Sequence, residues 1–186
     1  SAVRHRPDWI IVGEIRGEEA YVLFQALATG HGGLCTMHAE DAETTIKRLT
    51  QPPMNIPTTI IPLMHCIISV KYVKIPVLFE RGRSISKRKF VKVSEIESSN
   101  RIHDVFAWNT ISDTYQEDLS NSYFFRKMSE RWSLPLDYIR EEFERRKAVL
   151  NYLAEKNVRS YSNIAKFLNK FYNEPEVIYK EVLKAR

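Results

Sequence analysis

An unbroken apolar run that ends in an acidic residue limits how this chain can fold more than any other feature. The run Trp9–Val12 contains no polar residue, and Glu14 and Arg16 follow it almost at once. Because the run does not alternate, it favours a strand buried on both faces of a parallel sheet. Glu14 then lies just beyond the carboxyl end of that strand, at the edge where open α/β sheets bind ligands. An α/β fold with an acid at its ligand-binding edge is therefore predicted.

The following residues repeat the order of strand and helix. Residues 20–28 have the apolar spacing of an amphipathic helix, and a short apolar strand is predicted over 34–37. A second helix is predicted over 42–49, with Asp41 or Glu40 as its amino-terminal cap. This rhythm favours an α/β layer with parallel strands.

From residue 57 the pattern changes to short strands of period two. A short helical piece over 58–64 leads into a strand in which Ile68, Val70 and Tyr72 are expected to point inward. Further strands are predicted over 76–80, 90–97 and 104–109, with turns at 81–83 and 111–113. These strands suggest an antiparallel extension of the sheet.

Beyond about residue 119 the apolar spacing is helical to the end of the chain. One helix is predicted behind Pro135, a break at Asn157, a new cap at Ser160 or Ser162, and a final helix over 176–184. The expected domains are an α/β part over residues 1–110 and a helical region over residues 119–186.

Composition narrows the class of protein. Charged residues of both signs are mixed along the chain, whose net charge is +5, and the basic patch over 81–89 has the pattern of a solvated hairpin tip, so nucleic-acid binding is not expected. Cys35 and Cys66 stand singly and are predicted to be buried thiols rather than zinc ligands or a disulfide. No apolar run approaches the ~20 residues that span a bilayer, so we expect a soluble intracellular protein.

Two histidines and three glycines add chemistry near the acid. His31 lies among Gly30, Gly32 and Gly33, where backbone amides are able to approach a ligand closely, and His38 ends the predicted second strand. Both imidazoles are expected near Glu14, because the ends of neighbouring strands meet at one sheet edge.

The residue pattern alone leaves several roles open for Glu14. It is able to hold Mg²⁺ through water, to orient a nucleophilic water, or to ligate a metal directly. It is equally able to form a purely structural ion pair with Arg16, and each histidine taken alone is more often a hydrogen-bonded core residue.

The amino-terminal part of the chain closely resembles the secretion ATPase superfamily, which drives type II and type IV secretion, pilus assembly and the archaeal motility filament. The close match covers residues 4 to about 62, and its core reads RHRPDWIIVGEIRGEEAYVLFQALATGHGGLCTMHAED. Within it, IIVGEIRG resembles the Walker B segment and TGHGGLCTMHA the histidine box. The glycines of that box and the later segment PPMNIP favour the archaeal branch.

The resemblance implies a fold and a chemistry. The fold would be the carboxyl-terminal part of a RecA-like P-loop ATPase domain, with an antiparallel strand extension and then an α-helical tail. Glu14 would be the Walker B acid, acting on Mg²⁺ and water beside the γ-phosphate of ATP. Arg16, His31 and His38 would couple the phosphate state to the sheet and to a neighbouring subunit, with His38 nearer the phosphate. Arg4 and Arg6 match basic positions upstream of the motif.

The resemblance also implies partners and a location. The parent protein would form a homohexamer with nucleotide between subunits, and would act on a polytopic membrane platform protein. It would be cytoplasmic, held at the inner face of the cell membrane through that partner.

One motif of the family is absent from the sequence. No G-x-x-x-x-G-K-[ST] loop occurs, and no glycine is followed by lysine. That loop supplies the main cradle for the β- and γ-phosphates. The chain also opens with Ser-Ala-Val and enters an apolar strand within ten residues. We therefore expect a carboxyl-terminal fragment of an ATPase that does not turn over ATP alone.

Two other functions fit parts of the pattern. Glu14, His31 and His38, with His65 or Asp41, would suit a catalytic metal in a hydrolase, although their spacing matches no compact metal motif. Alternatively, the chain is a non-catalytic docking module whose basic tail binds a partner or an anionic membrane face. The basic residues concerned are Arg145, Arg146, Lys147, Lys156, Arg159, Lys166 and Lys170.

Overall fold

The computed structural model describes residues 5, 7–76 and 84–185. Its contacts divide the chain into two compact units, and the boundary in the sequence falls between Phe124 and Phe125. Several predicted features lie outside the described residues. They are Arg4 and Arg6, most of the strand over 76–80, and the turn over 81–83 with the adjoining part of the basic patch.

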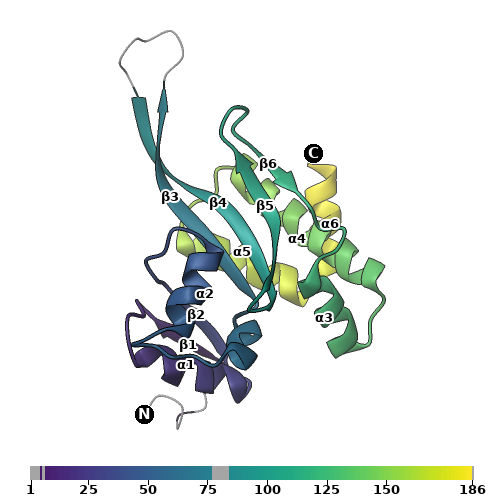
Figure 1. Ribbon diagram of the computed structural model, residues 1–186. Helices are drawn as coiled ribbons and strands as arrows, with labels where there is room; N and C mark the ends of the chain where they lie inside the picture. Colours follow the sequence, from purple (N-terminus) through teal and green to yellow (C-terminus); the bar gives the residue numbers. More distant parts are fainter. Residues whose placement is uncertain (1–4, 6, 77–83, 186) are drawn as a thin grey trace. The chain divides into compact units, whose positions relative to one another are not determined.

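The first unit opens with two parallel strands and their helices. Its elements in order are β1 (Trp9–Val12), α1 (Glu19–Ala28), β2 (Gly32–Cys35), α2 (Ala42–Thr50) and the 3₁₀ helix η2 (Thr58–Met64) (Figure 1). The parallel register pairs Trp9 with Gly32 and Val12 with Cys35. The prediction of parallel strands alternating with helices is confirmed, although β2 begins two residues before the predicted strand.

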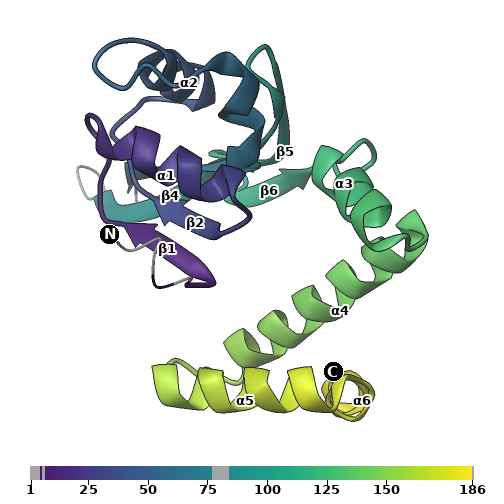
Figure 2. The ribbon, with the colours of Figure 1, turned by 90° about the horizontal axis from the view of Figure 1, so that it is seen from below.

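Only one face of the parallel pair is covered. Helix α1 lies against that face (Figure 2), where a β-carbon on Gly33 would come within 2.6 Å of the Leu27 side chain. On the other face Trp9, Ile11 and Leu34 are 61%, 73% and 56% exposed. The prediction that Trp9–Val12 is buried on both faces is therefore wrong for the described chain, because a second covering layer is not part of it.

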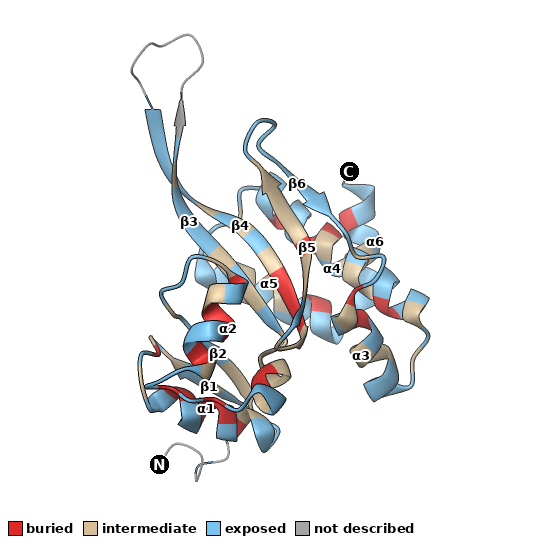
Figure 3. Ribbon diagram, in the orientation of Figure 1, coloured by how far each residue is buried: buried red, intermediate tan, exposed pale blue. Residues whose placement is uncertain are grey.

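The second sheet of this unit is antiparallel. It runs in the order β3 (Cys66–Pro76), β4 (Ser84–Ser98), β5 (Arg101–Asn109) and β6 (Thr114–Glu117), which confirms the predicted antiparallel strands and adds β6. Ile68, Val70 and Tyr72 are exposed, so their predicted inward direction is wrong. Figure 3 shows β3 in the colours of exposed and intermediate residues. The neighbouring position Ile67 packs against the core instead, because a shift of one residue turns a side chain to the other face of a sheet.

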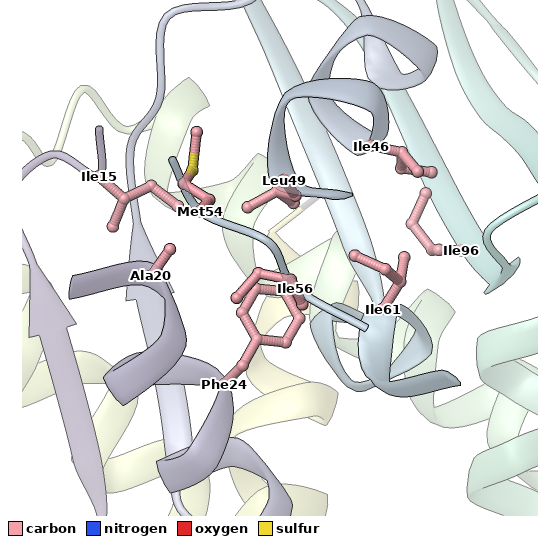
Figure 4. Close-up of a cluster of buried hydrophobic side chains, with 9 residues drawn as sticks. All are labelled: Ile15, Ala20, Phe24, Ile46, Leu49, Met54, Ile56, Ile61 and Ile96. Atoms are coloured by element: carbon pink, nitrogen blue, oxygen red, sulfur yellow. The ribbon is translucent and has the colours of Figure 1, made fainter. Parts of the chain in front are cut away.

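A single apolar cluster joins the two sheets through the helices of the first unit (Figure 4). Its fully buried members are Ile15, Ala20, Phe24, Ile46, Leu49, Met54, Ile56, Ile61 and Ile96. Ile15 directly follows Glu14 in the chain and is 2% exposed. The segment that carries the acid is thus anchored in the core by its next residue.

The cap of α2 is the predicted one. Asp41 accepts a hydrogen bond of 2.8 Å from the backbone N–H of Thr44. This bond lowers the pKa of the Asp41 carboxyl. Asp41, and not Glu40, is therefore the amino-terminal cap.

Replacing this cap is expected to weaken the first unit. Asp41→Ala leaves the Thr44 N–H without its acceptor, and should lower the Tm by about 2–4 °C at pH 7. Since the folded-state pKa of Asp41 is depressed, its contribution is present above the ordinary aspartate pKa and is lost as the pH falls through the folded value. Calorimetry at pH 7 and pH 3 checks this, with Glu40→Ala as the control. An equal Tm loss at both pH values would contradict it.

The second unit is helical. The helices of this region are α3 (Tyr123–Trp132), which begins two residues before the unit boundary, α4 (Leu136–Glu155), α5 (Tyr161–Asn173) and α6 (Pro175–Lys184). The predicted start behind Pro135 and the cap at Ser160, which accepts from the Asn163 N–H, are both confirmed. Asn157 has φ 54° and ends α4, also as predicted. The core of this unit consists of Ala148, Val149, Phe171, Ile178 and Val182.

Two further observations concern the whole described chain. Cys35 and Cys66 are both exposed, so the prediction of buried thiols is wrong, although partial desolvation still raises the pKa of each thiol. Within the described part of the chain, each helix is too short or too polar to span a lipid bilayer.

Candidate functional site

The carboxyl ends of β1 and β2 form one edge of the parallel pair, and this edge carries Glu14 and His38. Two hydrogen bonds continue the alignment past the strands. The Ile15 N–H donates to the Thr36 carbonyl at 2.9 Å, and the Thr36 hydroxyl donates to the Gly13 carbonyl at 2.5 Å. Because the strands are parallel and tied here, the residues that follow each of them lie side by side.

Glu14 is the centre of a small polar cluster at this edge. The Arg16 guanidinium donates to both of its oxygens, from Nε to Oε1 and from Nη2 to Oε2, each at 2.7 Å. The His38 Nε2 lies 3.4 Å from the same Oε1. The Glu14 side chain is 31% exposed and that of His38 is 85% exposed. The acid, the guanidinium and one imidazole are therefore together and open to solvent.

The charges around Glu14 favour its ionised form. The hydrogen bond from Arg16 is the largest cause that lowers the pKa of the Glu14 carboxyl, and the positive charges of Arg16 and Arg48 act in the same direction. The same pair raises the pKa of Arg16. Glu14 is accordingly a carboxylate near neutral pH, as required of a group that holds a cation or orients a water.

Two residues that sequence reasoning did not assign to the site support it. Arg48, in the last turn of α2, donates from Nη1 to the backbone carbonyl of His38 and so holds the His38 segment. Glu19, the first residue of α1, accepts hydrogen bonds from the backbone N–H groups of Arg16 and Gly17. The signal for Glu19 was present as an acid closely following Arg-Gly at a helix start. Arg48 has no comparable signal.

His31 lies at the opposite end of β2 from His38. It precedes the strand, and the N–H of the next residue, Gly32, donates to the Asp8 carbonyl at the start of β1. A four-residue strand spans about 13 Å, so the expectation that both imidazoles approach Glu14 is wrong for His31. Its Nδ1 lies 3.0 Å from the Thr29 hydroxyl and 3.2 Å from the Ala26 carbonyl, contacts that belong to the end of α1.

Packing and chain reversal account for the three glycines near His31. Gly30 has φ 94°, a left-handed conformation that ends α1 as predicted. Gly32 and Gly33 belong to β2, and a β-carbon on Gly32 would come within 2.7 Å of the Trp9 ring. The N–H groups of Gly30 and Gly32 donate to the carbonyls of Leu27 and Asp8. The expected approach of a ligand to these amides would have to compete with those bonds.

The geometry also bears on the metal-hydrolase alternative. Among the described residues, no three His, Cys, Asp or Glu side chains gather as a group able to hold a metal ion. Asp41 instead caps α2 and His31 lies at the far end of β2. The ligand set proposed for that alternative is therefore not assembled.

A shallow cavity of about 470 Å³ lies elsewhere on the first unit. Its lining comes from α2, the start of η2 and the β4–β5 turn, and includes Glu43, Lys47, Thr58 and Asn100. None of the predicted site residues lines it, so it is separate from the Glu14 edge.

Comparison with known proteins identifies similar sequences. The model of a family described as "Type II/IV secretion system protein" matches residues 1–100. An uncharacterized protein of Methanocaldococcus jannaschii is 40% identical over 136 residues, which cover 70% of this chain and 47% of that protein. A second uncharacterized protein of the same organism is 32% identical over 94% of this chain and 32% of its own length.

A bacterial relative matches a shorter stretch. The type IV secretion system protein PtlH of Bordetella pertussis is 43% identical over 58 residues, which cover 31% of this chain and 17% of that protein. The chain thus spans less than half the length of these curated relatives.

Proposed function

The chain belongs to the type II/IV secretion system protein family, and on this basis we propose that it is the carboxyl-terminal portion of an ATPase that couples ATP hydrolysis to protein secretion or to pilus or filament assembly. The observation that carries the proposal is the meeting of Glu14, Arg16 and His38 at the carboxyl edge of two parallel strands. A ligand bound at that edge would meet an acid, a guanidinium and an imidazole together.

Each group has a role in this proposal. Glu14 would be the Walker B acid, and it would hold Mg²⁺ through water and orient the attacking water. His38, 3.4 Å from Glu14 and open to solvent, approaches the phosphate. Arg16 responds to the loss of that phosphate, because a guanidinium binds phosphate and carboxylate oxygens in the same two-pronged manner. His31 acts from the other end of β2, toward a neighbouring subunit.

The side chains at the edge fit Mg²⁺ only through water. Mg²⁺ keeps several of its waters and takes few protein carboxylates, and here the half-buried Glu14 carboxylate is already bonded by Arg16 and lies beside His38. Mg²⁺ would neutralise charge that develops on the phosphate oxygens. Glu14 would accept hydrogen bonds from the water ligands of Mg²⁺ once the bond between Arg16 and one Glu14 oxygen is broken.

The proposed domains follow the resemblance. Residues 1–110 would be the carboxyl-terminal part of a RecA-like domain that carries Walker B and the histidine box, with Gly30, Gly32 and Gly33 in that box. Residues 119–186 would be a helical carboxyl-terminal region. The antiparallel sheet β3–β6 and the helices α4–α6 support this division by their element types.

The 186-residue chain by itself is not expected to hydrolyse ATP. It contains no phosphate-binding loop, and without that loop's amides and lysine the β- and γ-phosphates lack their main contacts. In a coupled assay with Mg²⁺ and ATP, the purified 186 residues should release phosphate no faster than a Glu14→Gln control. Steady turnover that disappears in Glu14→Gln would contradict this expectation.

The full-length protein would act as a machine at a membrane. We propose a homohexamer with ATP between subunits, in the cytoplasm, held at the inner face of the cell membrane by a polytopic platform protein. The matches to two proteins of Methanocaldococcus jannaschii support the archaeal branch of the family. The match to the type IV secretion system protein PtlH supports a role in secretion.

A docking role for the helical unit is a second candidate, favoured by its charge. Residues 125–186 carry 14 Lys and Arg against 9 Asp and Glu, so the entire net charge of +5 lies there. Arg145, Arg146 and Lys147 are paired with acids of their own unit, Arg159 donates to the Asn157 side chain, and Lys156 lies over the Tyr152 ring. Lys166 and Lys170 on α5 are therefore the better candidates. Reversal of these two charges should abolish secretion but leave the ATPase rate intact, and a parallel loss of ATPase would argue against docking.

A further inference from the structure

The carboxylate of Glu19 accepts hydrogen bonds from backbone N–H groups of the turn between β1 and α1. One oxygen, Oε1, accepts the backbone N–H of Gly17 at 2.8 Å and also that of Arg16. The other oxygen lies 3.4 Å from the point where a β-carbon on Gly17 would stand, an ordinary contact distance. These bonds lower the pKa of Glu19. The carboxylate therefore fills the inner side of the turn and fixes two successive peptide units.

The fixed turn determines where the Arg16 side chain begins. Arg16 and Glu14 are two residues apart, so on an extended backbone their side chains lie on the same side, and the guanidinium bonds both carboxylate oxygens at 2.7 Å. The bonds from the Arg16 and Gly17 N–H groups to Glu19 fix the backbone at the Arg16 end of this pair. The Arg16 side chain is 71% exposed and has little packing of its own to hold it. Its direction thus depends on the backbone at Arg16.

We propose that Glu19 is a positioning residue: it holds the Arg16 turn, and through the Arg16 guanidinium it orients the Glu14 carboxylate beside His38. The inference rests on the proposed function only for the importance of Glu14. The chain of contacts runs from the Glu19 carboxylate to the Arg16 backbone, and from the Arg16 guanidinium to Glu14.

Glu18 provides a matched control for Glu19. Both acids lie at the start of α1, where negative charge favours the helix dipole. Glu18 makes no side-chain capping bond, whereas Glu19 makes two bonds to the turn. A difference between variants at these positions therefore reports the bonds to the turn and not the charge at the helix start.

The positioning is measured by NMR of the Arg16 Nε–H in the 186-residue chain, with no nucleotide present. In Glu19→Ala the exchange of this proton with water should become about tenfold faster, because the bond to Glu14 is lost for most of the time. Glu19→Gln should retain most of the protection, since its amide oxygen still accepts from the turn. Glu18→Ala should leave the exchange unchanged. Equal exchange in Glu19→Ala and wild type, or equal acceleration by Glu18→Ala, overturns the proposal.

Activity of the full-length protein supplies the second measurement. Glu19→Ala should lower kcat about tenfold with little change in the Kd for ATP, since it misplaces a reacting group without touching the nucleotide. Glu19→Gln should restore most of the rate. Unchanged kcat in Glu19→Ala overturns the role in catalysis. Absence of ATPase in the wild type would refute the proposed function instead, and the NMR result would still decide whether Glu19 positions Glu14.

Discussion

Glu14→Gln in the full-length protein that carries these residues is expected to lower kcat for ATP hydrolysis by about 10²–10⁴-fold. The amide has nearly the same shape as the carboxylate but has no charge with which to hold the water ligands of Mg²⁺ or to orient the attacking water. The Kd for ATP should change little, because Glu14 lies at the proposed γ-phosphate end and contacts no other part of the nucleotide. Phosphate release and equilibrium binding of a fluorescent ATP analogue measure the two quantities.

Glu18→Gln is the control for this substitution. It removes one negative charge four residues away, at a side chain that makes no capping bond. It should retain the wild-type kcat. If Glu14→Gln also kept its rate, or if both variants lost it equally, Glu14 would not be the acid of the reaction.

Phe24→Ala is expected to produce the largest loss of stability in the first unit, about 3–5 kcal/mol in the free energy of unfolding. Phe24 is 2% exposed and is one of the buried residues of the cluster in Figure 4, to which α2 and η2 also contribute. Its removal would leave a cavity that the surrounding isoleucines are unable to fill. Urea denaturation followed by circular dichroism measures the change.

A neighbour on the same helix gives the comparison. Val22 is 57% exposed, so Val22→Ala should change the free energy of unfolding by no more than about 0.5 kcal/mol. Phe24→Leu should fall between the two, because it keeps most of the apolar volume. Similar losses for Phe24→Ala and Val22→Ala would mean that the cluster does not hold this unit together.

Local signals predicted most of the elements of the fold. The unbroken run Trp9–Val12 identified β1, and the cap at Asp41 identified the start of α2. Pro135 and Ser160 placed the starts of α4 and α5 in the same way. Each of these signals acts through the conformation or hydrogen bonds of a few adjacent residues, so it is recognisable from the sequence alone.

The predictions that failed concern which face of a strand is buried, because packing against residues distant in the sequence determines that face. In the segment CIISVKYV both Ile67 and Ile68 are apolar, so the sequence does not say which one faces the core. The covering helices select Ile67, and Ile68 is exposed. Trp9–Val12 is apolar on both faces, but α1 covers only one of them.

The candidate site shows the same division. Glu14 and His38 were placed together because parallel strands end at one edge, which is a local inference from two strand ends. His31 was misplaced because it precedes the strand predicted over 34–37 and therefore lies at the amino end of that strand, away from Glu14. Contacts with the Trp9 ring and the Leu27 side chain make Gly32 and Gly33 part of β2, which places His31 directly before the strand. Those contacts come from residues six or more positions away.

The central claim is that Glu14 and His38 meet at the γ-phosphate of a bound nucleotide. A structure of the full-length protein with Mg²⁺ and a non-hydrolysable ATP analogue tests it most directly. We expect the Glu14 carboxylate to contact the water ligands of Mg²⁺, the His38 ring to face the γ-phosphate, and Arg16 to have released at least one oxygen of Glu14. Nucleotide bound away from this edge, with the Glu14–Arg16 pair intact, would contradict the claim.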